Sequence, residues 1–240
     1  MQIPLLDPDQ PHFPNPAAAL TEPDGLLAAG GNLLPQTLVN AYRRGIFPWY
    51  QDGDPILWWS PAIRCVIDPL TLHCSKSLHK SLRRKDYQVT VNAAFDQVIV
   101  ACSEPRDNEG GTWITEEMIA AYTELHRLGR AHSFEVWHNR QLVGGLYGIA
   151  VGGLFCGESM FSRRTDSSKI AMAHLCRWGL EFGIELIDCQ LVNPHLLSLG
   201  AQSVKRGEFL KQLAHLREQH SPWPEQSTQQ PSLTLDYDWE

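Results

Sequence analysis

The chain has 240 residues, of which 43% are hydrophobic and 20% are charged, and its formal net charge is −7. This length and apolar fraction are enough for one large globular domain or for a small domain beside a medium one. The negative charge argues against nonspecific binding to nucleic acid or to an anionic membrane. Because no run of eighteen apolar residues and no signal-peptide pattern occurs, we expect a cytoplasmic protein without a membrane segment.

The cysteines and histidines give no sign of a metal site. Six cysteines are scattered along the chain without a CxxC pair, and the ten histidines show neither HExxH nor HxH spacing. Such spacing is typical of reduced thiols in the cytosol rather than of a disulfide framework or a zinc site. We therefore expect no metal and no cofactor.

The first sixty residues are rich in proline and aromatic side chains. Prolines at positions 11, 14, 16 and 23 predict that the first thirty residues lack regular structure, and a short helix is predicted from Pro35 to a stop at Gly45. Trp58 and Trp59 are typical of an aromatic core for a small N-terminal domain over residues 1–61. Trp49 follows a proline in a loop and is a candidate platform for stacking a ligand.

From residue 62 onward, strands alternate with helices up to about residue 220. Strands are predicted over 65–67, 87–91, 134–137, 142–151, 154–161 and 185–191, and helices over 75–85, 93–102 with Asn92 as cap, 115–129 and 168–182. This order predicts an α+β fold with a mixed sheet flanked by helices. Glycines within 142–151 indicate a bulge or a close backbone approach. Residues 221–240 are rich in Pro, Gln and Ser and are expected to form a weakly ordered tail.

Two surface features allow more than one interpretation. Five cations lie within the first of these helices, namely Lys76, Lys80, Arg83, Arg84 and Lys85. They fit either a solvated helix face or a contact for a phosphate backbone. Trp113 stands at a loop-to-helix junction, which is typical of a ligand rim and equally of a hydrophobic staple.

Three polar residues interrupt apolar strand patterns. Glu158 lies in the strand 154–161, and Asp188 with Gln190 lies in the strand 185–191. The side-chain period of two puts Asp188 and Gln190 on one face, with Cα atoms about 6.5–7 Å apart. Because buried polar groups need partners, the three residues either satisfy one another in the core or meet a bound group.

Two kinds of acyl-transfer chemistry can be weighed against these residues. Cys156 or Cys189 could act as a nucleophile with His174 or His195 as base, but both cysteines lie in apolar strands, where thiols are usually inert. The order of elements is similar to that of acyl-CoA-dependent N-acetyltransferases, in which a glycine-containing loop before the central helix binds the CoA diphosphate. The corresponding loop, residues 161–169, has no glycine, which disfavours CoA and indicates an acyl donor held in another way.

Five segments then resemble the leucyl/phenylalanyl-tRNA–protein transferase family. They read GIFPW from Gly45, LWWSP from Leu57, GTWIT from Gly111, LFCGESMFS from Leu154 and LIDCQ from Leu186. The resemblance runs in order over roughly residues 10 to 220. It implies a small N-terminal domain joined to an acetyltransferase-like domain. It also implies transfer of Leu or Phe, with Met as a further donor, from aminoacyl-tRNA to the α-amine of proteins that begin with Lys or Arg, which marks them for degradation.

The resemblance implies roles for individual residues. Gln190 would position the attacking amine, Asp188 would supply negative charge to the developing ammonium, and Glu158 would hold the aminoacyl-adenosine. Trp49 and Trp113 would flank the terminal adenosine, and Tyr42 with Trp49 would border the acceptor peptide. The cations from Lys76 to Lys85 would contact the tRNA acceptor stem. The aminoacyl pocket would be lined by Leu146, Phe155, Met160, Met172, Leu175 and Ile187.

Specificity and rival functions stay open at this stage. The family pattern has Met in place of Leu146 and Phe in place of Leu175, so a differently shaped pocket and an altered preference between Leu and Phe are expected. Acidic residues among Glu104, Asp107 and Glu109 are candidates to meet the positive charge of the acceptor. A peptidoglycan-type aminoacyl transferase is disfavoured because the chain shows no internal repeat, and a noncatalytic RNA-binding module is the third alternative. We expect a monomer.

Overall fold

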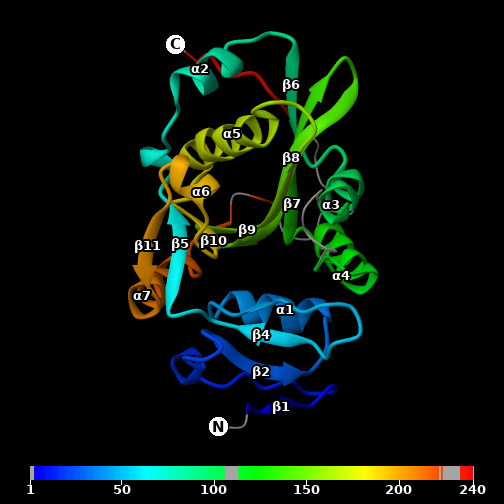
Figure 1. The fold of residues 1–240 in the computed structure, drawn as a ribbon, viewed down its shortest axis with the longest axis vertical. Helices are drawn as coiled ribbons and strands as arrows, with labels where there is room; N and C mark the ends of the chain where they lie inside the picture. The colour runs from blue at the N-terminus through cyan, green and yellow to red at the C-terminus, as the bar shows by residue number, and fades with distance from the viewer. Residues whose placement is uncertain (1–2, 106–112, 222, 224–232, 240) are drawn as a thin grey trace.

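The computed structural model describes residues 3–105, 113–221, 223 and 233–239, and its strands form two sheets (Figure 1). The small sheet has the strand order β1-β2-β4-β3, and helix α1 (Pro35–Tyr42) packs beside it. Its strands are β1 (Leu5–Leu6), β2 (Leu26–Gly30), β3 (Phe47–Pro48) and β4 (Leu57–Trp59). The expectation that the first thirty residues lack regular structure is therefore wrong for β1 and β2.

Trp58 is at the centre of the small sheet. Its side chain is fully buried, its indole Nε1 donates to the Gly30 carbonyl at 2.8 Å, and its ring meets Phe13 edge-on at 4.7 Å. A buried tryptophan whose N–H is satisfied stabilises a small core at no polar cost. The aromatic core predicted at Trp58 is present, whereas Trp59 is only partly buried.

The large sheet has eight strands in the order β11-β5-β10-β9-β8-β7-β6-β12. Every described pair in it is antiparallel except β9 and β10, which run parallel, so the sheet is mixed. Its strands are β5 (Ile63–Ile67), β6 (Tyr87–Val91), β7 (Ala131–His138), β8 (Gln141–Val151), β9 (Leu154–Ser162), β10 (Leu186–Gln190), β11 (Gln202–Lys205) and β12 (Leu233–Leu235).

Helices cover both faces of the large sheet (Figure 1). The central helix α5 packs on one face together with α2, and α3 and α4 pack on the other, where α1 also contacts the sheet. The helices are α2 (Lys76–Leu82), α3 (Phe95–Ser103), α4 (Glu116–Arg127), α5 (Ser167–Phe182), α6 (Pro194–Ser198) and α7 (Arg206–Leu216). A mixed sheet flanked by helices is the fold class that the sequence predicts. Within the described ranges, no helix is long and apolar enough to cross a membrane.

Several predicted boundaries need correction. The basic helix ends at Leu82, so Arg83, Arg84 and Lys85 follow it in a turn. Asn92 does not cap α3, which begins after Ala94. Its side chain instead accepts from the Ser133 N–H at 3.1 Å, and its backbone has φ of 60°. Phe182, the last residue of α5, is 50% exposed.

Two glycines of β8 have the close approaches that the sequence indicates. A Cβ at Gly144 would lie 2.5 Å from the Ser167 Cβ, at the start of α5. A Cβ at Gly148 would lie 2.2 Å from the Cys156 carbonyl oxygen, where the β8–β9 register shifts. Any side chain at either position would push α5 or β9 away.

The segment after α7 packs against the large domain in its described parts. Trp223 is 4% exposed and stacks on Trp178 of α5 at 4.3 Å, and β12 pairs with β6 at the edge of the sheet. Near the end of the chain, the Trp239 ring meets His174 at 5.1 Å. For these residues, the expectation of a weakly ordered tail is wrong.

Candidate active site

A pocket opens where the parallel strands β9 and β10 separate. Their pairing ends at Asp188 opposite Cys156, and the next residues, Gly157 and Cys189, line the pocket. The pocket has a volume of about 460 Å³, within the usual range for small-molecule sites. It is lined by Phe47, Pro48, Trp49, Trp113, Leu146, Gly157, Glu158, Ser159, Met160, Met172, Leu175, Cys189, Gln190, Leu191, Asn193, His195 and Leu196.

The apolar wall of the pocket contains four of the six side chains proposed for it from the sequence. Leu146 and Met160 come from paired positions of β8 and β9, and Met172 and Leu175 come from one face of α5. Phe155 and Ile187 are not among the lining residues, because their fully buried side chains belong to the core behind the wall.

The rim of the pocket carries both candidate stacking tryptophans. Trp49 is 41% exposed, and its carbonyl accepts from the Trp59 indole at 2.7 Å, which fixes the loop after β3. Trp113 lines the pocket just before the N-terminus of α4, which Thr115 caps by accepting from the Met118 N–H. Two aromatic side chains from different elements therefore border one opening.

Tyr42 and Asp188 lie behind the pocket rather than in its wall. Asp188 is fully buried and paired with Arg64, whose Nε and Nη2 donate to the two carboxylate oxygens at 2.8 and 2.7 Å. Arg64 Nη1 also donates to the Gly45 carbonyl at 3.1 Å, so this residue joins β5, β10 and the loop that follows α1.

Strand β10 does not keep the alternation that the sequence predicts. Gln190 has φ of 55°, and the register with β5 shifts between Asp188 and Gln190. The Gln190 backbone N–H donates to Asp188 Oδ1 at 3.0 Å, which closes a local turn. The turn directs the two side chains to different partners, because the Gln190 amide donates to Glu158 and not to Asp188.

Glu158 is the centre of a hydrogen-bonded chain. Its Oε1 accepts from Gln190 Nε2 at 2.9 Å, and its Oε2 accepts from the Tyr122 hydroxyl at 3.0 Å. The Tyr122 hydroxyl is in turn bonded to that of Tyr42. Desolvation by burial raises the pKa of Glu158 to about 7, against the opposing effect of the tyrosine hydroxyls.

Sequence patterns predict no role for Arg64 or Tyr122, although both side chains hold the predicted polar residues in place. Arg64 interrupts the apolar strand Ile63–Ile67, which was an available signal, since a buried arginine almost always has a paired carboxylate. Tyr122 follows the apolar period of α4 with Met118 and Leu125. Nothing in that pattern distinguishes its hydroxyl from an ordinary core contact.

The cysteine alternative loses support. Burial raises the pKa of the Cys156 thiol well above its usual value, and a hydrogen bond with Cys65 together with burial does the same for Cys189. His174 is buried, its Nδ1 meets the Ile170 carbonyl at 2.8 Å, and burial lowers its pKa to about 4. All six cysteines lie in the described ranges and none forms a disulfide. Across the same ranges, no cluster of three or more metal-ligating side chains occurs.

The basic side chains are exposed, but two of them already have partners. Arg84 pairs with Asp86 through its Nε at 3.0 Å and its Nη2, and Arg83 Nε donates to the Trp239 carbonyl at 2.7 Å. Of the proposed acceptor-binding acids, Glu104 pairs with Arg163 at 2.6 Å and does not line the pocket. Asp107 and Glu109 lie outside the described residues.

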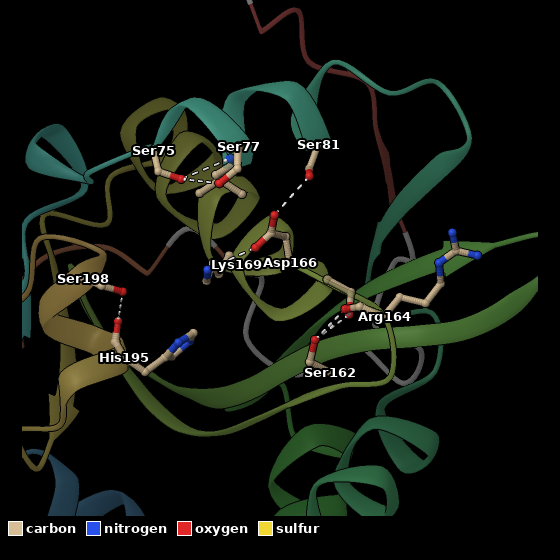
Figure 2. A network of polar contacts seen from close by, with 11 residues as sticks. Ser75, Ser77, Ser81, Ser162, Arg164, Asp166, Lys169, His195 and Ser198 are labelled. Atoms are coloured by element: carbon tan, nitrogen blue, oxygen red, sulfur yellow. Dashed lines mark hydrogen bonds and ion pairs between the residues drawn. The ribbon is translucent and has the colours of Figure 1, made fainter.

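A carboxylate occupies the start of the central helix. Figure 2 shows Asp166 between Ser81 of α2 and Lys169 of α5, to which it is bonded at 3.2 and 3.0 Å. Asp166 has φ of 64° and immediately precedes α5. A helix N-terminus favours a bound anion such as a diphosphate, and here the Asp166 carboxylate already supplies the negative charge. Like the absence of glycine from the loop 161–169, this disfavours CoA.

The fold and the pocket define an α+β protein whose mixed sheet is flanked by helices and whose apolar pocket is bordered by a hydrogen-bonded carboxylate and amide. Residues 66–214 match the family model for leucyl/phenylalanyl-tRNA protein transferase, and residues 31–62 match the model for its N-terminal domain. The chain belongs to this family and is an aminoacyltransferase.

Its relatives agree with this placement. It is 55% identical to the leucyl/phenylalanyl-tRNA–protein transferase of Nitrosomonas europaea, with 85% of this chain and 86% of that one covered. The corresponding protein of Cellvibrio japonicus is 52% identical, with 92% and 94% covered. A GCN5-related N-acetyltransferase from Kribbella flavida has a TM-score of 0.38 at 12% identity, with 67% of this chain and 57% of that one covered.

Proposed function

We propose that this chain transfers Leu or Phe, with Met as a further donor, from aminoacyl-tRNA to the α-amine of proteins that begin with Lys or Arg. The modified N-terminus would act as a degradation signal. The enzyme would act in the cytoplasm as a monomer without a cofactor. Its six cysteines form no disulfide, which fits a reducing compartment.

One observation carries the proposal: the pocket combines an apolar wall with a carboxylate and an amide bonded to each other. Leu146, Met160 and Met172 offer a surface for an aliphatic or aromatic side chain. Glu158 and Gln190 lie on the polar side, where the ester carbonyl and the attacking amine would meet. An aminoacyl ester is already activated, so the main requirement is to orient the two reactants.

The remaining parts of the donor fit the surroundings of the pocket. Trp49 and Trp113 would stack against the terminal adenosine of the tRNA. The exposed cations near α2 would contact phosphates of the acceptor stem. A CoA donor would meet the carboxylate of Asp166 at the start of α5, which opposes binding of its diphosphate.

A transfer assay tests this function. The protein is incubated with Leu-tRNA or Phe-tRNA carrying a labelled amino acid and with a peptide that begins with Arg; a peptide that begins with Glu serves as control. We expect label in the Arg peptide alone. Label in a peptidoglycan precursor would support the cell-wall alternative, and retained tRNA binding with no transfer to either acceptor would support the RNA-binding module.

Substitution of Leu146 tests the aminoacyl wall. Leu146→Ala enlarges the pocket, so we expect the ratio of kcat/KM for Phe-tRNA over Leu-tRNA to rise by roughly tenfold, the usual scale for a misfit of this size. Val143→Ala on the same strand is the matched control, because Val143 is buried but does not line the pocket. Equal ratios in the two variants would show that Leu146 does not contact the donor side chain.

Charge reversal near α2 tests the tRNA contact. Lys80→Glu combined with Lys85→Glu should weaken tRNA binding by about tenfold or more near 0.1 M salt and reduce the slope of log K against log salt by roughly 2. These lysines are chosen because Arg83 and Arg84 already have partners within the chain. Lys211→Glu on α7 provides the control. An unchanged salt dependence in the double variant would place the tRNA elsewhere.

A further inference from the structure

The two carboxylates near the pocket have different neighbours. Both oxygens of Asp188 accept from Arg64, and Oδ1 also accepts from the Gln190 N–H. This pair is fully buried, and Asp188 does not line the pocket. A carboxylate so fully engaged with a guanidinium has little capacity to accept a proton from a substrate.

Glu158 differs from Asp188 in its access to the pocket and in the charge of its hydrogen-bond donors. It lines the pocket, and its two oxygens accept from neutral donors, the Gln190 amide and the Tyr122 hydroxyl. No described salt bridge involves it. Each carboxylate oxygen has two lone pairs, so each can accept a further hydrogen from a bound amine.

We propose that Glu158 is the general base of the transfer reaction and that Tyr122 is the residue that positions it. This inference rests on the proposed function. The uncharged acceptor amine attacks the ester carbonyl carbon, a C–N bond forms, and one amine proton passes to the Glu158 carboxylate. The bond to the ribose oxygen then breaks, and Glu158 returns the proton to that oxygen. The products are the amide and a free tRNA hydroxyl, and Glu158 ends unprotonated.

The hydroxyl chain sets the direction of the hydrogen bonds. Tyr122 has one hydroxyl hydrogen and gives it to Glu158, so Tyr42 must donate to the Tyr122 oxygen. Burial raises the pKa of Tyr122 well above its usual value, so its hydroxyl keeps this hydrogen near neutral pH. Both tyrosines are buried and come from α1 and α4, so the small N-terminal domain helps to place the carboxylate.

The charge state of Glu158 fits the role of a base near neutral pH. Burial raises its pKa, the Tyr42 and Tyr122 hydroxyls oppose the rise, Asp188 of β10 adds to it and Arg64 of β5 opposes it, with a net pKa of about 7. Tyr147 of β8 and Cys156 of β9 also face this region. The basic form therefore accumulates as pH rises through about 7, and kcat/KM should rise over the same window.

Single-turnover transfer of labelled Phe from Phe-tRNA to an Arg peptide, measured from about pH 5.5 to 9, tests the assignment. Glu158→Gln should lower the transfer rate by on the order of 10²–10⁴-fold and leave tRNA affinity within a few-fold, because the amide keeps the shape but accepts no proton. Tyr122→Phe should move the acidic limb of the wild-type profile upward by roughly one pH unit, because a donor to the charged form is lost. Tyr147→Phe is the matched control: it removes a buried tyrosine hydroxyl that makes no described hydrogen bond, so it should move the limb less.

The controls separate this inference from the proposed function. The acceptor peptide is the same in every measurement, so the ionisation of its amine cannot produce a shift that differs between variants. Wild-type protein that transfers no label overturns both the function and the base. If the wild-type protein transfers label, and Glu158→Gln keeps its rate within about fivefold and the same acidic limb, the role of Glu158 is overturned. The proposed function then still stands. An acidic limb that does not move in Tyr122→Phe overturns the positioning role of Tyr122.

Discussion

Replacing Arg64 with methionine should lower the free energy of unfolding by about 3–5 kcal/mol, the usual cost of leaving one partner of a buried ion pair alone. The Arg64 side chain is 2% exposed and that of Asp188 is fully buried. Without the guanidinium, the Asp188 carboxylate keeps the Gln190 N–H as a donor at 3.0 Å but loses the positive charge that balances its own. Equilibrium urea unfolding at pH 7 measures the loss, and a change in midpoint at constant slope identifies it as a change in stability.

The same substitution should also reduce transfer activity, because Arg64 connects the pocket to its surroundings. Its guanidinium lies 4.9 Å from the Phe47 ring centroid and 4.6 Å from that of Phe209, and it donates to the Gly45 carbonyl. Phe47 lines the pocket two residues before Trp49. Loss of Arg64 therefore disturbs one side of the opening and the turn at Gln190 together.

A double variant separates the charge effect from the loss of packing. Arg64→Met combined with Asp188→Asn removes both charges and keeps an amide oxygen for the Gln190 N–H. We expect this variant to recover a large part of the stability that Arg64→Met alone loses, because a neutral pair no longer buries an unpaired charge. A double variant no more stable than the single one would mean that the loss comes from packing against the two phenylalanines.

The polar centre shows how far sequence reasoning reaches in this chain. Glu158, Asp188 and Gln190 could be identified because each interrupts an apolar strand, and the structure brings all three close together. That Asp188 pairs with Arg64 while Glu158 pairs with Gln190 could not be predicted. It depends on the turn at Gln190, whose φ of 55° breaks the period of two on which the prediction rested. A left-handed backbone at a residue other than glycine has no reliable sequence signal.

Most of the fold follows from local patterns, and the exceptions depend on distant contacts. Strand β6 has the bounds that its alternating residues predict, and α4 begins one residue after its predicted start, with Thr115 as cap. Strand β2 could not be predicted, because its pairing with β4 joins segments far apart in the chain. Burial of Trp223 could not be predicted either, because its segment is polar in composition and its partners, such as Trp178, are distant in the chain.

Replacing Trp223 with alanine should lower the free energy of unfolding by about 3–5 kcal/mol, the usual range for a fully packed tryptophan. Its ring stacks on His132 at 3.9 Å and on Trp178 at 4.3 Å and lies 5.8 Å from Phe155. These contacts hold α5 against the sheet on the side where Met172 and Leu175 form the pocket wall. Urea unfolding followed by circular dichroism measures the loss, and the activity of the variant should fall with it.

Trp239→Ala is the matched control within the same C-terminal segment. Trp239 is only partly buried and meets His174 edge-on at 5.1 Å, so its loss should cost about 1 kcal/mol. A Trp223→Ala variant as stable as the Trp239→Ala variant would mean that the segment after α7 contributes little to the core. The expected difference would instead show that residues beyond the family match at 214 help to shape the pocket, since Trp223 packs with α5 in the same core cluster.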